Sequence, residues 1–290
     1  MKKILLVIGF ATYSIFGFSQ FYNVPKKGMF LEKDIPNVGI IDYVSHPHDS
    51  VSWSQGIQSL TTDKKYLYAS SYSPWGTIYK INPENLKVIK KIKYKLPGKE
   101  ERIKKKKSSM LQLHKHLMHD KNNLFIGCSS REKIYKINKK TGDIIDSIPG
   151  PPTPERQQFY GGICYYGGYY WVIRNDYNYG TMIFKLSKYG YIVDKYDLSF
   201  FPRCDGISIE NGRVWVNEKR NGVTTMIQFS YLDLINKKFP LVCRRWDVSE
   251  DTFGAVNSIV EIDNNYYFHT GNAHHTGGLL IHSKFVQNKK

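Results

Sequence analysis

Residues that could do chemistry occur just before and just after short apolar stretches along the chain. The set before such stretches is Gln55, Gln112, Gly161, Asp205 and Asn257, and the set after them is Ser71, Cys128, Arg174, Glu218 and Thr270. Most of these side chains are polar, and Arg174 and Glu218 carry opposite charges. Convergent polar groups at a concave mouth are typical of a small-ligand site. The alternative is a water-filled channel whose lining only satisfies the backbone.

Three of the polar residues could act as general acids or bases. They are Asp205, Glu218 and His269, whose side chains can exchange a proton with a bound substrate. Their spacing alone does not specify a reaction. The sequence contains no nucleophile elbow, phosphate-binding loop or dinucleotide fingerprint. The pattern therefore favours binding over catalysis.

Histidines form the candidate metal ligands. His114 and His116 alternate, so on a strand they would share one face, and His269 precedes a Gly-rich loop. Imidazole is a common ligand of divalent metals, with a carboxylate as a frequent companion. We therefore keep a divalent metal ion as an optional cofactor at His114, His116 and His269.

Aromatic side chains lie in the same loops. Trp75 and Trp53 are placed where they could stack on a sugar or another flat ligand. The alternative is that both tryptophans pack between neighbouring sheets.

The elements that must position these residues repeat along the chain. Each repeat has the pattern of four short strands separated by turn residues. The third strand has the sequence IYKIN in the first two repeats, IFKLS in the third and IQFSY in the fourth. These third strands begin at residues 78, 134, 183 and 227. Repeats of about 40 to 50 residues with four strands each indicate the blades of a β-propeller. A sandwich of unrelated hairpins is the less consistent alternative.

A single strand precedes the first repeat, and the last repeat lacks its fourth strand. The segment 38–45 reads as that lone strand, and the final repeat nearly reaches the end of the chain. Pairing of the two would close the ring and remove an open sheet edge. We therefore predict an all-β fold: a β-propeller of five four-stranded blades closed by an N-terminal strand, with six blades as the alternative.

The first residues have the pattern of a secretory signal peptide. Residues 1–19 contain a basic start, an apolar run and small residues before Gln20. The apolar run is shorter than the roughly 20 residues of a spanning helix. We predict a signal peptide at 1–19, an extended lead-in at 20–37 and one propeller domain at 38–290. The mature protein is then exported, periplasmic or extracellular, without a membrane span and monomeric.

The charge and the cysteines restrict the partners and the redox chemistry. The formal charge is +17, which can indicate a polyanion partner, but lysines are scattered and an exported protein has no nucleic acid as its target. The basic run from Lys99 to Lys107 reads as a solvated loop, or alternatively as a patch for an anionic glycan or lipid. Four cysteines in an oxidising compartment permit disulfides, and the three alternative pairings stay open.

The first repeat resembles the glutamine cyclotransferase family. The resemblance rests on Ser54-Gln55-Gly56-Ile57, Tyr66-Leu67-Tyr68, Ser70-Ser71-Tyr72 and the stretch from Gly76 to Ile81, with a weaker echo at 211–217. It also extends to NHL and lactonase-like propellers. It implies a five-bladed propeller and cyclisation of N-terminal glutamine by an acid that follows the Leu-Tyr pair. Here that position is Ala69, whose methyl group cannot transfer a proton.

Three functional hypotheses follow. The first is an exported, non-catalytic propeller that binds a small molecule, peptide or glycan; its ligand-binding residues would be Gln55, Trp75, Gln112, Arg174, Asp205 and Glu218. The second is an enzyme, either cyclotransferase-like or a metal-assisted hydrolase or lactonase, that uses Glu218, Asp205 and a nearby histidine. The third is a scaffold that presents the basic 99–107 loop to an anionic surface.

Overall fold

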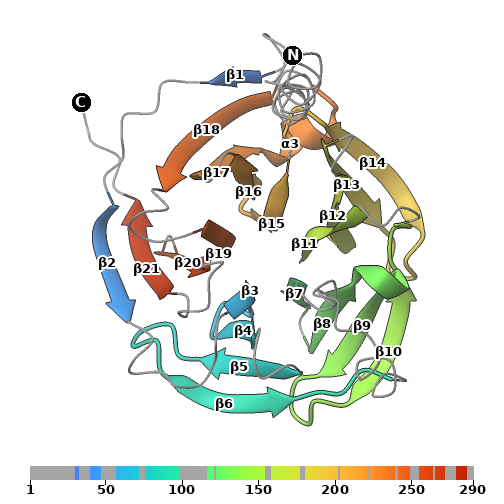
Figure 1. Ribbon diagram of the computed structural model, residues 1–290, viewed down its shortest axis with the longest axis vertical. Helices are drawn as coiled ribbons and strands as arrows, with labels where there is room; N and C mark the ends of the chain where they lie inside the picture. Colours follow the sequence, from blue (N-terminus) through green and yellow to red (C-terminus); the bar gives the residue numbers. More distant parts are fainter. Residues whose placement is uncertain are drawn as a thin grey trace, which may run out of the picture.

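The structure is a computed structural model in which five β-sheets stand around a common axis (Figure 1). It describes residues 30–32, 40–46, 57–71, 76–97, 116–120, 122–153, 158–176, 180–201, 203–220, 223–238, 241–248, 255–263, 265–271 and 279–285. We number the sheets in chain order by their innermost strands. The arrangement is that of a β-propeller, as the repeats predicted.

The strands of each sheet follow one another from the axis to the rim. The first sheet contains β3 (Ile57–Thr62), β4 (Leu67–Ser71), β5 (Thr77–Ile81) and β6 (Val88–Lys93). The second contains β7 (His116–His119), β8 (Asn123–Cys128), β9 (Lys133–Asn138) and β10 (Ile144–Pro149). The third contains β11 (Gln158–Tyr166), β12 (Tyr169–Asp176), β13 (Gly180–Leu186) and β14 (Ile192–Leu198).

The last two sheets recruit strands from the beginning of the chain. The fourth contains β15 (Cys204–Glu210), β16 (Arg213–Arg220), β17 (Val223–Ser230), β18 (Leu241–Val248) and the short β1 (Phe30–Glu32). The fifth contains β19 (Ala255–Ile262), β20 (Asn265–Gly271), β21 (Leu279–Phe285) and β2 (Ile40–His46). The pairing of β2 with β21 confirms that the early strand completes the last sheet.

The strand number differs from the expected five blades of four strands. Four sheets have four strands, whereas the fourth sheet has five. The additional strand is β1, which pairs in parallel with Leu241–Cys243 at the start of β18. The segment 20–37 was expected to be an extended lead-in, and β1 lies within it. The outer edge of β18 offers unpaired backbone groups, and three residues of the lead-in take them up.

Alternating side chains explain why the outer strands lie at the rim. In β6 and the residues that follow it, Ile92, Tyr94 and Leu96 are buried while Lys91, Lys93 and Lys95 are exposed. A strand places successive side chains on opposite faces, so such alternation suits one buried and one solvated face. The third strands are buried on both faces, as at Ile78, Tyr79 and Ile81.

Hydrogen bonds join neighbouring inner strands. The amide of Leu60 donates to Ser258 Oγ at 2.9 Å, and the amide of Leu117 donates to Ser59 Oγ at 3.0 Å. These bonds connect β3 with β19 on one side and with β7 on the other. The innermost strands of all five sheets are neighbours in a closed cycle. We call the end of the ring where they begin the upper end, and the other end the lower end.

Glycine allows the third and fourth sheets to approach each other. A Cβ atom on Gly162 would lie 2.7 Å from the amide nitrogen of Ile207, and one on Gly161 would collide with the carbonyl oxygen of Cys204. A side chain at either position would force the inner strands β11 and β15 apart. The close packing of these two strands therefore requires glycine at both positions.

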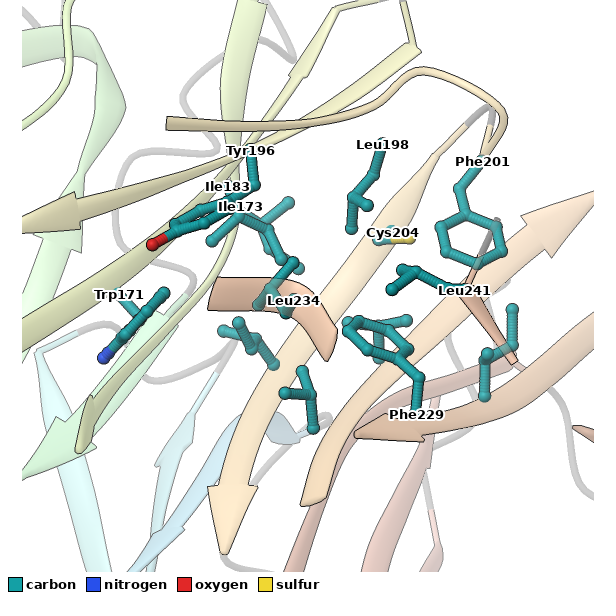
Figure 2. Close-up of a cluster of buried hydrophobic side chains, with 14 of the residues drawn as sticks. Trp171, Ile173, Ile183, Tyr196, Leu198, Phe201, Cys204, Phe229, Leu234 and Leu241 are labelled. Atoms are coloured by element: carbon teal, nitrogen blue, oxygen red, sulfur yellow. The ribbon is translucent and has the colours of Figure 1, made fainter. Parts of the chain in front are cut away.

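The core consists of layers between neighbouring sheets. The largest cluster lies between the third and fourth sheets and contains Trp171, Ile173, Val214 and Val216 (Figure 2). The short helix α3 (Tyr231–Ile235) contributes Leu234 to it. Cys204 is also buried in this layer. Each sheet is thus held by side chains from both of its faces.

Ion pairs connect three sheets at the lower end. Lys64 Nζ lies 2.5 Å from Glu210 Oε2, and Arg213 Nη2 lies 2.7 Å from Glu261 Oε1. Lys64 Nζ also donates to the Glu261 carbonyl at 3.4 Å. Because these residues belong to the first, fourth and fifth sheets, the network joins the two ends of the repeat series.

Two expectations from composition can be compared with the structure. No disulfide joins Cys128, Cys164 and Cys204 to one another, and the side chain of Cys243 is outside the described residues. In the part of the chain described, no helix is long and apolar enough to cross a membrane. The segments 1–19 and 99–107 lie outside the described residues.

Candidate ligand site at the upper end of the ring

The upper ends of the third and fourth sheets bring together buried polar side chains. Glu218 stands opposite Cys204 in the pairing of β15 with β16, and Asp205 follows Cys204. Glu218 is 2% exposed and Asp205 is 7% exposed. The structure therefore places these two predicted site residues in one region, at the start of one inner strand and near the end of the next strand outward.

Asp205 is held by its neighbour on the chain. Arg203 Nε and Nη2 donate to Asp205 Oδ1 and Oδ2, each at 2.9 Å. This fork-to-fork pairing fixes the plane of the carboxylate. Arg203 is about one-third exposed while the Asp205 side chain is largely covered, so the pair lies at the boundary between solvent and the interior.

Asn175 ties the third sheet to the site. Its Nδ2 donates to the Cys204 carbonyl at 2.7 Å, and its Oδ1 accepts from the Cys204 amide at 3.0 Å. Thr181 Oγ1 also donates to Asn175 Oδ1 at 3.0 Å. The Asn175 side chain therefore bonds both backbone groups of Cys204 across the gap between the sheets. These bonds hold the start of β15, where Asp205 lies, in place.

Asn217 is buried without a hydrogen-bond partner among the described residues. It is 0% exposed, and neither Oδ1 nor Nδ2 has a partner within the described part of the chain. It lies on the face of β16 that Trp215 shares, and the Trp215 ring packs 5.4 Å from that of Tyr266 in the fifth sheet. A buried amide with neither atom satisfied costs free energy, and native structures usually supply such a group with water or a ligand.

Arg174 and Glu218, which were expected to line one channel with opposite charges, point into different gaps between sheets. Arg174 Nη1 donates to the Pro152 carbonyl at 2.8 Å, and its guanidinium lies 4.9 Å from the Phe184 ring centroid. Both contacts are on the face of the third sheet that looks toward the second. Val214 and Val216 pack against the third sheet, so strand alternation places Glu218 on that face. The two charges therefore occupy different gaps between sheets, because strand side chains point at neighbouring sheets.

Several predicted residues cannot be placed. Gln55, Trp75, Gln112 and His114 lie outside the described residues. The backbone of His269 pairs with Ser258 and Leu280, and its side chain is not among those described.

The structure gives no support for a metal centre among the described residues. His116 is buried at the start of β7, near the axis. In the described ranges, no three His, Cys, Asp or Glu side chains are grouped so that they could hold a metal ion. A metal site at His114, His116 and His269 therefore stays a prediction.

Another histidine has a perturbed environment at the lower end. His119 Nε2 lies 3.3 Å from Lys139 Nζ, and its ring stacks on Tyr68 at 5.9 Å. Burial, and then the Lys139 ammonium, lower the pKa of His119 to about 4. The Lys139 ammonium also lies 3.4 Å from Asp63 Oδ2, which accepts from the Tyr68 hydroxyl at 2.8 Å. This cluster joins the first and second sheets away from the candidate site.

The position of the implied catalytic acid is apolar in its surroundings as well as in its side chain. Ala69 is fully buried and lies opposite Leu60 and Tyr79 in its sheet. It belongs to the apolar cluster that includes Leu67 and Val260. An acid at this place would be buried among mostly apolar side chains, which makes its charged form costly.

Comparison with known proteins gives a likeness of fold. No protein-family model matches the chain, and no curated protein matches it. The crystal structure of Myxococcus xanthus glutaminyl cyclase has a TM-score of 0.54 at 13% identity, covering 84% of this chain and 94% of that one. At this identity the likeness concerns the fold alone.

Two further solved structures are less similar. Kuenenia stuttgartiensis hydrazine synthase has a TM-score of 0.44 at 9% identity, covering 75% of this chain and 56% of its own. A chain of a nidogen–laminin complex has a TM-score of 0.42 at 13% identity, covering 74% and 72%.

The residues that sequence reasoning missed are amides. Asn175 and Asn217 each directly precede an acidic residue, Asp176 and Glu218 respectively. Both pairs lie toward the upper end of the second strand of their sheet. This recurrent Asn–acid pair is a signal that could have drawn attention to them. Their different roles, one fully bonded and one without partners, depend on the neighbouring sheet and could not be read from the chain.

Proposed function

We propose that the chain is an exported five-bladed β-propeller that binds a small molecule, peptide or glycan at its upper end without chemically changing it. The binding region would include Asp205 and Glu218. The observation that carries the proposal is that these two carboxylates are both largely buried and lie close together at the upper end of the fourth sheet.

The chemistry of these groups favours a ligand with hydroxyl or N–H groups. Carboxylates at Asp205 and Glu218 accept hydrogen bonds from such groups. Peptides and glycans carry such donors and acceptors along their length. Low exposure at Asp205 and Glu218 would strengthen each bond made there, because the surroundings are less polar than water.

The absence of an acid at residue 69 supports binding over catalysis. One solved structure with a similar fold is a glutaminyl cyclase, and the position that the family resemblance gives to the catalytic acid is Ala69 here. An enzyme would have to use Glu218 or Asp205 instead, and Asp205 is already paired with Arg203. The enzyme hypothesis remains the alternative.

A binding screen with matched variants tests the proposal. Purified mature protein is screened against short peptides and oligosaccharides by thermal shift, and each hit is measured by titration calorimetry. The affinity of a true ligand should fall at least tenfold in Glu218→Gln and Asp205→Asn. Glu210→Gln, which changes a carboxylate at the other end of β15, should leave the affinity within twofold.

Two outcomes would count against the proposal. Equal losses in Glu218→Gln and Glu210→Gln would place the ligand elsewhere. Turnover of a hit, detected by mass spectrometry and abolished in Glu218→Gln, would support the enzyme alternative. Metal analysis of the same preparation separates the two enzyme types, since a metal-assisted hydrolase would carry a stoichiometric metal that chelator removes.

The intact mass of the exported chain would test whether residues 1–19 are removed.

A further inference from the structure

An exposed apolar patch lies where the third sheet reaches the rim at its lower end. The patch consists of Tyr189, Tyr191, Ile192 and Val193, and all four side chains are exposed. Tyr191 is 71% exposed and Val193 is 51% exposed. The two tyrosine rings lie 6.4 Å apart. Contiguous exposed apolar groups of this kind mark interaction surfaces more often than single ones do.

Part of this patch is shared with the other sheets. Each of the first three outer strands has a bulge after its first pair, and the extra residue is Ile89, Ile145 or Val193. These three aliphatic residues are about equally exposed, at 52%, 50% and 51%. Val193 alone therefore does not distinguish the third sheet.

The residue two positions before the bulge does distinguish it. That residue is Lys87 in the first sheet, Asp143 in the second and Tyr191 in the third, and all three are exposed. Charged side chains on an edge strand prevent other strands from pairing with it. The third sheet has an exposed aromatic ring where the first two sheets have a charge.

In the fourth sheet, the corresponding edge residues are uncharged, and another strand pairs with them. Leu186 pairs with Ile192 in the third sheet, as Phe229 pairs with Cys243 in the fourth. Leu241–Cys243 therefore corresponds to residues 190–192. That stretch of β18 is covered by β1, which adds to it in parallel as an extended segment. Figure 1 shows β1 outside β18, while β14 lies at the rim on the other side of α3.

We propose that the edge of β14 around Tyr191–Val193 is a docking site for an extended segment of a partner protein. The segment would pair with the backbone of β14 as β1 pairs with β18. Strand β14 is the outermost strand of its sheet, so half of its backbone groups point away from β13. A polypeptide backbone is the partner that satisfies a row of such groups, and its side chains would cover the tyrosines.

The surroundings specify the chemistry of the segment. Lys188 and Lys195 are both exposed and stand on either side of the apolar patch. The acidic residue between them, Asp194, forms an ion pair with Lys237, with 2.8 Å between Lys237 Nζ and Asp194 Oδ1. The flanks of the patch are therefore basic. The segment that fits has apolar residues in its centre and acidic residues at its ends.

Selection from a peptide library tests this proposal. Ten-residue peptides with six variable positions, flanked by two aspartates on each side, are displayed on phage and selected on the full chain. Enriched peptides should bind in fluorescence anisotropy and should lose at least tenfold in affinity for Tyr191→Lys and for Val193→Lys. Methylation of alternate backbone nitrogens in the peptide should abolish binding, because it removes the donors of the pairing.

Ile145→Lys is the matched control, since Ile145 occupies the same bulge position in the second sheet with the same exposure. It should bind the selected peptides as the unchanged chain does. Failure to enrich any peptide, or equal loss in Val193→Lys and Ile145→Lys, would overturn the proposal. Self-association of the unchanged chain in sedimentation experiments that Tyr191→Lys abolishes would also overturn it, because the occupant would then be a second copy. Circular dichroism melts of each variant exclude unfolding as the cause.

Discussion

Asn217 is a buried amide without a partner in the described part of the chain, and one substitution can measure what this costs. Asn217→Leu replaces the amide by an apolar side chain of similar size. We expect the free energy of unfolding of the ligand-free protein to rise by about 1–3 kcal/mol, because the desolvated polar atoms are removed. Urea denaturation followed by fluorescence measures the change.

Asn175→Leu is the control for this substitution. Asn175 is equally buried, but it bonds the backbone of Cys204 and the hydroxyl of Thr181. Its loss should destabilise the protein by about 1–3 kcal/mol, since the backbone groups of Cys204 would be left unsatisfied. A destabilised Asn217→Leu variant would show instead that the amide has a partner in solution.

His119 makes the stability depend on pH. Its pKa is about 4 in the folded protein and 6.5 as the ordinary value, so between these limits the unfolded chain binds more protons. The free energy of unfolding should therefore fall as the pH is lowered from about 7 toward 4. Solvent screening limits this contribution to at most about 1 kcal/mol per pH unit.

His119→Phe checks this assignment, because it keeps a ring against Tyr68 and removes the titration. The slope between pH 7 and pH 5 should become shallower. The charged neighbours Lys139, Asp63 and Asp120 remain in the variant, so any slope that persists belongs to them or to other groups. An unchanged slope would exclude His119 as its source.

At the scale of the element, the close approach of β11 and β15 should be intolerant of a single methyl group. Gly161→Ala would drive its Cβ into the Cys204 carbonyl and the Asn175 amide. We expect a loss of at least about 2 kcal/mol in unfolding free energy, because the inner strands would have to separate. Thermal melts monitored at the tyrosine and tryptophan bands measure it.

Gly127→Ala is the comparison within the second sheet. A Cβ there would lie 3.4 Å from Tyr160 and 3.5 Å from Ile163, which is ordinary contact with side chains. We expect its unfolding free energy to stay within about 1 kcal/mol of the unchanged chain. If both alanine variants are equally stable, backbone proximity does not limit the approach of the sheets.

The elements were largely predictable, while the direction of their side chains was not. The IYKIN repeats indicated strands at 77–81 and 133–138, because local composition and turn residues fix such boundaries. The direction of Arg174 was missed, because each strand is packed on both faces and the sequence does not specify which neighbouring sheet a given side chain contacts. The isolation of Asn217 depends on the fifth sheet, which lies far along the chain.

At the scale of the whole molecule, the ring depends on the pairing of β2 with β21. Removal of residues 1–46 should leave the edge of β21 unpaired. We expect the shortened chain to melt at least about 5 °C lower and to aggregate near its melting temperature, because the closing strand and its covered edge are lost. Differential scanning calorimetry with light scattering measures both effects.

A shorter deletion provides the control for this experiment. Removal of residues 1–32 takes away β1 but keeps β2, so the ring should stay closed and most of the stability should remain. Equal losses in the two shortened chains would assign the effect to β1. Unchanged melting of the longer deletion would show that the sheets hold without a strand shared between the chain ends.

The shared sheet also has a consequence in time. Strand β2 begins at Ile40 and its partner β21 begins at Leu279, so 239 residues separate them along the chain. At a synthesis rate of about 5–20 residues per second, β2 waits roughly 10 to 50 seconds before its partner exists. Throughout that interval a seven-residue strand, IIDYVSH, has no place in its own sheet. The ring can close only after residues 279–285 have been synthesised, so β2, one of the first strands to be made, is among the last to find its position.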